Sequence, residues 1–405
     1  MGCNSIPDAT DNIRKKLHKW KKIYIIQGLI NYLEKNMDEV LSKFKGCILG
    51  GAVGDALGYP VEFLKMDEII EEYGKNGITS HKLYNNKALI SDDTQMTMYT
   101  ACGLLKGYTR FVTRGIMGDW AMYVHRAYQD WRYTQFSSFG KPVSLGSCWL
   151  LNVQDMYSCR APGNTCLNAL ETNRCGKTYS PINNSMGCGG VMRVAPVGLY
   201  LPKHLKSIEE VDQVGAEVAA ITHGNPLAYI PAAALVHIIA KASTTQDDLE
   251  GIIQDAKSTV GKLYADKEGV DIFELFMDKA VALAHEDIND LDAIRELGEG
   301  WFGLEALSIA VYCAVKYQDD FVKAICVAVN HDGDSDSTGA ITGNILGAYH
   351  GVEVIPDGFL EHLELKETLD TLITDLYHDC PFENGEIKSD QWKDKYIMGT
   401  YQENQ

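Results

Sequence analysis

The longest apolar stretch of the chain, PLAYIPAAALVHIIAKA at residues 226–242, decides the fold class. Its apolar residues follow a helical pattern and lack the strict alternation of a half-buried strand. The stretch is shorter than the roughly 20 residues that a membrane span needs, and it contains Pro231, His237 and Lys241. It therefore predicts the core helix of a soluble protein, and no membrane association is expected.

Helical patterns continue on both sides of this stretch, and alternating strand-like runs are few. No Pro- or Ser-rich linker interrupts residues 43–380, so we expect one large all-α domain there. Residues 1–42 begin polar and then become helical in pattern, which predicts an N-terminal helical arm. Residues 381–405 are charged and polar, and they are expected to form a loosely held tail.

Charge and cysteine content restrict the function. The chain has 405 residues and a formal charge of −18, from 37 basic and 55 acidic side chains. This charge repels phosphate backbones, so no nucleic-acid partner is expected, whereas a basic protein would be attracted. The 11 cysteines show neither a CxxC pair nor the spacing of a zinc site. With no apolar signal region at the N-terminus, these features predict a reduced, cytoplasmic protein.

The first acidic cluster is SDDT at residues 91–94, which lies where a helical pattern begins. Two interpretations stay open. Acidic residues in a first turn are favoured by the helix dipole and need no further role. Alternatively, four hard oxygen ligands at one point of the chain could share a cation.

The second acidic cluster is HDGDSDS at residues 331–337, followed by a segment rich in Gly and Ala. Its spacing can aim Asp334 and Asp336 at one point. An EF-hand is excluded, because Ser337 and Gly343 stand where that loop needs Gly and Glu. Carboxylates this close repel one another without a counterion, so a cation site is favoured over a simple helix cap.

If the two acidic clusters meet in space, they offer carboxylates and hydroxyls but no soft ligand. This set of ligands suits two hard divalent cations, Mg²⁺ or Mn²⁺, rather than zinc. Two such cations can clamp oxygens of a substrate and activate a water molecule. If the clusters meet, their residues are therefore suited to hold two such cations side by side.

Two glycine-rich segments cover residues 50–58 and 183–196. The first matches neither a P-loop nor a dinucleotide fingerprint, and close helix packing is its alternative interpretation. Glu62, shortly after it, is either a solvated loop acid or a functional one. In the second segment, the glycines of Gly187–Gly190 free the backbone to bring N–H groups to an anion such as a diphosphate. Arg193 could assist this binding or be structural.

Five short motifs, taken in order, resemble those of the ADP-ribosylglycohydrolase family. The resemblance implies an all-α, single-domain fold with a binuclear Mg²⁺ or Mn²⁺ centre in a cleft. It also implies an enzyme that removes ADP-ribose from modified protein side chains by hydrolysing an N-glycosidic bond. The matching motifs are Gly54–Gly58 with Glu62, Ser91–Thr94, Gly187–Arg193, Thr222–Gly224 and Gly333–Gly339.

Position within these motifs implies a role for individual residues. The metal ligands implied by the resemblance are Ser91, Asp92, Asp93, Asp334, Asp336 and Ser337. The implied catalytic residues are Asp92, Asp93 and Glu62. The implied ligand-binding residues are Gly187, Cys188, Gly189 and Gly190 at the diphosphate, and His223 at the ribose. Asp130 is a further acid that we expect near the rim of the site.

The resemblance also implies the chemistry and the partners. Asp92 or Asp93 would orient the attacking water or accept its proton, while charge develops on the sugar. Arginine is the expected acceptor, and serine-linked ADP-ribose and O-acetyl-ADP-ribose remain alternatives. The expected partner is an ADP-ribosylated protein. The N-terminal arm, residues 1–42, is not part of the family core, and we expect it to pack on its own domain, with an oligomer contact as an alternative. A second hypothesis is an immunity-type protein whose arm also binds an ADP-ribosyltransferase toxin.

Overall fold

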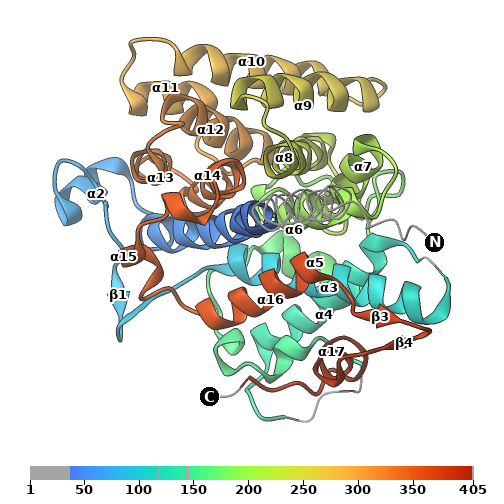
Figure 1. The fold of residues 1–405 in the computed structure, drawn as a ribbon. Coiled ribbons are helices and arrows are strands. Elements are labelled where there is room, and N and C mark those ends of the chain that lie inside the picture. Colours follow the sequence, from blue (N-terminus) through green and yellow to red (C-terminus); the bar gives the residue numbers. More distant parts are fainter. Residues whose placement is uncertain (1–36, 117, 142–143, 145, 404–405) are drawn as a thin grey trace, which may run out of the picture.

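The computed structural model describes residues 37–403 except 117, 142–143 and 145, and it confirms the predicted all-α fold (Figure 1). The named strands in this part form two antiparallel hairpins of two residues per strand, β1–β2 and β3–β4. A helix without a label in the figures covers residues 37–58.

The labelled elements follow in chain order, with 3₁₀ helices and one π-helix (η7) marked η. From the N-terminal side to the core helix they are η1 (Tyr59–Val61), α2 (Met66–Tyr73), β1 (Leu83–Tyr84), β2 (Lys87–Ala88), α3 (Asp92–Arg114), α4 (Trp120–Phe136), η2 (Trp149–Asn152), η3 (Gln154–Tyr157), α5 (Asn164–Glu171), η4 (Cys188–Gly190), α6 (Ala195–Tyr200), η5 (Leu201–Lys203), α7 (Ile208–Ala220) and α8 (Pro226–Thr244). The remaining elements are α9 (Leu249–Leu263), α10 (Val270–Ala284), α11 (Asp290–Leu297), α12 (Gly303–Lys316), α13 (Phe321–Val329), α14 (Ser335–His350), η6 (Val352–Val354), α15 (Asp357–Leu360), α16 (Lys366–His378), β3 (Phe382–Glu383), β4 (Glu386–Ile387), α17 (Asp390–Lys393) and η7 (Asp394–Met398).

Helix α8 is the core helix that the apolar stretch predicts, and other helices surround it (Figure 1). Length and composition alone would allow it to cross a membrane, but 83% of its most apolar window is buried inside the protein. Asn225 begins the helix by accepting a hydrogen bond from the N–H of Leu227 at 2.9 Å. The polar side chain of His237 is buried but hydrogen-bonds Asp212 of α7 at 2.9 Å. This partner offsets the cost of placing a polar group in the core.

The helix of residues 37–58 packs against α14 through glycines at every fourth position (Figure 1). A Cβ atom added at Gly54 would lie 2.0 Å from the carbonyl oxygen of Gly339, so the two backbones are in direct contact. The close-packing interpretation of the first glycine segment is therefore confirmed. The facing positions are Gly46 with Gly347, Gly50 with Gly343, Gly54 with Gly339, and Gly58 with Ser335.

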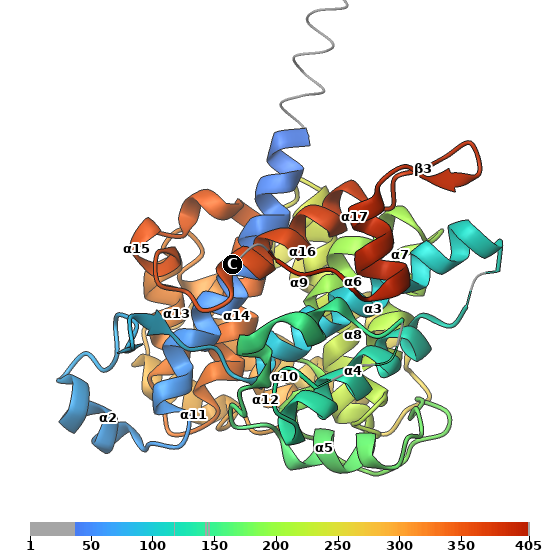
Figure 2. The same ribbon diagram turned by 90° about the horizontal axis from the view of Figure 1, so that it is seen from below.

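The described C-terminal residues are held more tightly than expected. Trp392 and Tyr396 are buried, and Lys395 donates to Asp375 of α16 at 2.6 Å. In Figure 2 this red segment lies against the helical body, and η7 contacts α3. The expectation of a loose tail is wrong for these residues, because aromatic side chains occur at positions where they can be buried among the polar ones.

Of the predicted N-terminal arm, residues 1–42, positions 1–36 lie outside the described residues. The hypothesis that the arm binds a toxin falls on these positions. Residues 37–42 are described, and they continue without a break into the helix of residues 43–58. Tyr377 of α16 donates to the carbonyl oxygen of Met37 at 2.9 Å, and the N–H of Val352 donates to Ser42 at 3.0 Å. This end of the arm packs against the body of the protein.

Cys102 of α3 and Cys148, just before η2, form a disulfide with their Cα atoms 6.6 Å apart. The spacing of the cysteines did not indicate this pair, because 46 residues separate them. The bond joins the long loop that follows α4 to the middle of α3. The eight other described cysteines are free.

Candidate metal and ligand site

The two acidic clusters form the N-terminal ends of α3 and α14. Ser91 caps α3 and accepts a hydrogen bond from the N–H of Asp93 at 3.2 Å. Asp334 caps α14 and accepts from the N–H of Ser337 at 3.4 Å. The cap interpretation is thus correct for both clusters. The two helix ends also meet, because Ser337 donates its hydroxyl proton to Asp93 at 2.8 Å, across 244 residues of sequence.

Glu62 completes the acidic group from a third segment. It follows η1, where the chain turns by 95° between the helical residues 37–61 and α2. One of its carboxylate oxygens lies within 4.8 Å of oxygens of Asp334 and Asp336. Glu62 is only 8% exposed, so the alternative of a solvated loop acid is wrong. The glycine contacts between residues 37–58 and α14 bring these distant residues together.

Burial and mutual repulsion dominate the electrostatics of this group. Burial raises the pKa of Glu62, and the charges of Asp336 and Asp334 raise it further. Burial followed by the charge of Asp336 likewise holds the pKa of Asp92 and Asp93 well above the usual range. Each of these carboxylates therefore favours a positive partner or a bound proton.

The donor atoms of this group fit a hard divalent cation. They are carboxylate and hydroxyl oxygens, which Mg²⁺ and Mn²⁺ prefer. The Oε2 atom of Glu62 is buried and has no hydrogen-bond partner among the described residues. Asp92 is oriented by the N–H of Gly163 at 3.2 Å, and Asp336 by the N–H of Ser337 at 2.9 Å. A cation at this point would satisfy the unpaired oxygen and offset the repulsion.

Asp55 is a residue of the site that the sequence analysis missed. It is fully buried, and its carboxylate accepts hydrogen bonds from the N–H of Ser91 at 3.0 Å and of Thr94 at 3.1 Å. Burial and the charge of Asp336 raise the pKa of Asp55 to about 7. The residue supports the turn that carries the first acidic cluster. Its only signal in the sequence was a carboxylate among the glycines and apolar residues of the first glycine segment.

A cavity of about 510 Å³ opens over these carboxylates. It lies within the size range of small-molecule sites. Ser91 and Gly190 are not part of its lining, although both were predicted site residues. Ser91 is buried beneath, where it serves as the cap of α3. The predicted residues that line the cavity are Glu62, Asp92, Asp93, Gly187, Cys188, Gly189, His223, Asp334, Asp336 and Ser337.

Two further acids lie outside this cavity. Asp332 belongs to the second acidic cluster, but it accepts a hydrogen bond from the N–H of Met66 at 2.9 Å and pairs with Arg295 at 2.9 Å. It therefore joins α2 and α11 to the site without entering it. Asp130 of α4, which we expected near the rim, lines a different cavity.

The second glycine segment forms one wall of the cavity through η4. Its glycines allow close packing rather than unusual backbone angles. None of Gly187, Gly189 and Gly190 has a positive φ. A Cβ added at Gly189 would lie 2.9 Å from the ring of His223, so this glycine permits the close approach of the histidine. The N–H groups of Gly187 and Cys188 already donate to Ser185 and Trp301. Within the described residues, the N–H of Gly189 has no carbonyl partner and is left to face an anion, whereas Gly190 lies outside the cavity lining.

Arg193 lies beneath this wall and supports His223. It is fully buried, does not line the cavity, and donates to the hydroxyl of Thr222 at 2.6 Å. Thr222 in turn hydrogen-bonds Nδ1 of His223 at 2.8 Å. Burial, and then the charge of Arg193, lowers the pKa of His223 to about 3, so its imidazole is neutral. The structural interpretation of Arg193 is therefore the correct one.

Two exposed aromatic side chains stand at the rim of the cavity. Phe63 and Trp301 are stacked with ring centroids 6.0 Å apart, and both belong to the lining. Phe63 is 70% exposed and follows Glu62 directly. Exposed apolar rings beside a polar cavity are typical of a binding site.

Comparisons with known proteins agree with this architecture. The chain is 24% identical to ADP-ribosylhydrolase ARH3 of Mus musculus, over 83% of this chain and 91% of that protein. It is 23% identical to the ADP-ribosylarginine hydrolase Tri1 of Pseudomonas putida, over 85% and 80% of the two chains. A solved structure described as an ADP-ribosylglycohydrolase-related protein complex shares the fold, with a TM-score of 0.50, 22% identity, and coverage of 84% and 99%.

The family assignment rests on a match over most of the chain. Residues 36–385 match the sequence profile of ADP-ribosylglycohydrolase. The matched region contains every residue that lines the acidic cavity. This protein therefore belongs to the ADP-ribosylglycohydrolase family of hydrolases.

Proposed function

We propose that this protein is a Mg²⁺-dependent hydrolase that removes ADP-ribose from modified arginine side chains of proteins. One observation carries the proposal: carboxylates from three distant segments converge beneath a single cavity, beside a glycine wall and a neutral histidine. A group of oxygen donors this dense suits two Mg²⁺ ions, with Mn²⁺ as a substitute. The name of the relative Tri1, an ADP-ribosylarginine hydrolase, supports arginine as the acceptor.

Different walls of the cavity would bind different parts of the substrate. The N–H of Gly189, which lines the cavity, would hold the diphosphate, because N–H groups at the start of a helical turn attract anions. His223 would contact the ribose through its neutral ring, which its hydrogen bond to Thr222 fixes in place. Phe63 and Trp301 at the rim would contact the remainder of the substrate.

The carboxylates would carry the proton transfers. A water molecule attacks the anomeric carbon, the carbon–nitrogen bond to the acceptor breaks, and positive charge develops on the sugar. Asp92 or Asp93 would accept the proton of that water. Glu62, which lies beside Asp334 and Asp336, would stay ionised with a cation bound, and the departing guanidine would take its proton from an ordered water molecule. Bound divalent cations would supply positive charge that orders the ribose hydroxyls and the water.

The test is the release of ADP-ribose from an arginine-modified protein, measured with Mg²⁺ and after thorough chelation. The double variant Asp92→Ala with Asp93→Ala should abolish release. Asp332→Asn is the matched control, because this aspartate of the same acidic run points away from the cavity. It should retain most of the activity. Full activity in the double variant or after chelation would refute the mechanism.

A parallel assay on serine-linked ADP-ribose tests the acceptor. Arginine-linked substrate should be cleaved faster by at least about tenfold, which corresponds to about 1.4 kcal/mol of transition-state binding. Faster cleavage of the serine-linked substrate would refute the arginine assignment and leave the metal-dependent hydrolysis intact.

A further inference from the structure

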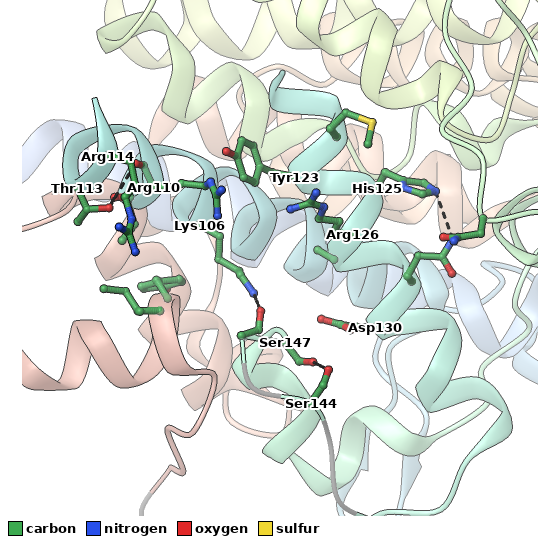
Figure 3. A pocket seen from close by; sticks show the side chains of 18 residues that line it. Lys106, Arg110, Thr113, Arg114, Tyr123, His125, Arg126, Asp130, Ser144 and Ser147 are labelled. Atoms are coloured by element: carbon green, nitrogen blue, oxygen red, sulfur yellow. Dashed lines mark hydrogen bonds between the residues drawn. The ribbon is translucent and has the colours of Figure 1, made fainter. Parts of the chain in front are cut away.

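A second, larger cavity lies away from the acidic site. Its volume is about 740 Å³, and it shares no lining residue with the first cavity. Figure 3 shows that its walls come from the second half of α3, from α4 and from the loop near Ser144 and Ser147. Residues Tyr396 and Ile397 of η7 close one side.

The lining of this cavity is basic, in a chain whose net charge is −18. Lys106, Arg110 and Arg114 lie four residues apart on α3, so they share one face of that helix. Arg126 joins them from α4 (Figure 3). The one acid in the lining, Asp130, accepts a hydrogen bond from the N–H of Cys148 at 2.6 Å.

The three guanidinium groups in this cavity are free to bind an anion. Among the described residues, the side chains of Arg110, Arg114 and Arg126 have neither a hydrogen bond nor a carboxylate partner within 4.0 Å. By contrast, Arg132, also on α4, pairs with Glu171 at 3.4 Å. The dipole of α3 alone would explain a cation in its last turn, at Arg114. It does not explain Arg126, which lies inside α4.

The same cavity also has an apolar side. Met122 and Ile397 belong to the lining, and they are 37% and 43% exposed. Tyr123, the neighbour of Met122 on α4, adds an aromatic ring to the same lining. A purely inorganic anion would leave this apolar surface in water. A ligand with both phosphates and a flat apolar ring would cover it.

We propose that this cavity is a binding site for a nucleotide that carries at least two phosphates. Arg110, Arg114 and Arg126 bind the phosphates, with Lys106 beside them, because guanidinium groups pair well with phosphate oxygens. The base lies against Met122 and Ile397. Lys106 is 14 positions after Asp92 along α3, or about 21 Å at 1.5 Å per residue. A nucleotide in this cavity is therefore separate from any ligand over the acidic cluster.

The test is a calorimetric titration of the full-length protein with ADP, in low salt and with EDTA present. EDTA removes divalent cations, which would otherwise draw nucleotide phosphates to the acidic cluster. We expect ADP to bind, and the double variant Arg110→Gln with Arg126→Gln to weaken binding by at least about tenfold. The control, Lys257→Gln with Lys279→Gln, removes two positive charges from α9 and α10 and should leave the affinity unchanged.

Several results would overturn the proposal. One is a dissociation constant for ADP above about 1 mM in the wild-type protein. Another is equal affinity in the arginine double variant, which would place ADP elsewhere. Pyrophosphate should bind several-fold more weakly than ADP. Equal affinity of the two would show that the base makes no contact with Met122 and Ile397 and would refute a nucleotide site. The arginine variant should keep its unfolding temperature and its rate of ADP-ribose release, so this test stands apart from that of the hydrolase.

Discussion

Replacement of Glu62 by Gln should stabilise the protein without divalent cations and weaken its stabilisation by Mg²⁺. Glu62 faces two carboxylates within 4.8 Å, and one of its oxygens has no hydrogen-bond partner among the described residues. Gln keeps the size of the side chain and removes its charge. Repulsion is thereby relieved in the metal-free protein, whereas a ligand is lost from the metal-loaded one.

The distances set the magnitude of this effect. Two unit charges 4.8 Å apart repel by about 3 kcal/mol at an effective dielectric constant of about 20. The carboxyl groups take up protons rather than bear the full repulsion, so the net gain in unfolding free energy should be about 1–3 kcal/mol at pH 8.

The pH dependence follows from the direction of the pKa shift. The pKa of Glu62 is raised in the folded state. The protonated side chain therefore contributes fully to the unfolding free energy below the unfolded-state pKa of about 4.3, and this contribution is lost as pH rises toward the folded-state pKa. Without metal, the difference in unfolding free energy between the variant and the wild type should therefore be small at about pH 4.5 and should grow toward pH 8.

Urea unfolding of both proteins, with EDTA and with Mg²⁺, measures the effect. Asp375→Asn is a matched control, because Asp375 is also 8% exposed but pairs with Lys395 at 2.6 Å. Its loss should destabilise the protein by about 3 kcal/mol, equally with and without Mg²⁺. If metal-free Glu62→Gln is less stable than the wild type at pH 8, or if Mg²⁺ stabilises both equally, the reasoning about the acidic cluster is wrong.

Three further substitutions test how the site is built. Gly54→Ala should lower the unfolding free energy by about 3 kcal/mol or more, because its Cβ would lie 2.0 Å from the carbonyl oxygen of Gly339, and urea unfolding would show this. Gly189→Ala should cost about 1–3 kcal/mol and raise KM for the ADP-ribosylated substrate, since its Cβ would displace His223; an unchanged KM would contradict that contact. Trp301→Ala should change the unfolding free energy by less than about 1 kcal/mol but raise KM. A lower kcat with an unchanged KM would rule out a rim contact.

The helical fold and the caps could be predicted because they depend on neighbours in the chain. Apolar residues at helical spacing identified α8, and the polar side chains at positions 91 and 334 do cap α3 and α14. Such caps form between a side chain and backbone N–H groups two or three residues further on. The other candidate site residues were predicted from the family motifs, which give the positions of these residues but not their geometry.

The sequence could not separate aspartates with the same surroundings in the chain. Asp332 and Asp334 are two residues apart, yet one pairs with Arg295 and the other lines the acidic cavity. Asp55 went unnoticed because its partners are backbone N–H groups 36 and 39 residues away. The direction of each side chain depends on which segments pack beside it.

By itself, the sequence determined that the chain folds as helices, and it located two clusters of oxygen-bearing side chains that cap α3 and α14. The tertiary structure alone decided that the two acidic clusters and Glu62 form one site. The physical reason is the glycine contact between residues 37–58 and α14: without Cβ atoms the backbones touch, so the ends of these helices meet. A contact between residues about 300 positions apart, such as Gly46 and Gly347, depends on close packing rather than on any local preference.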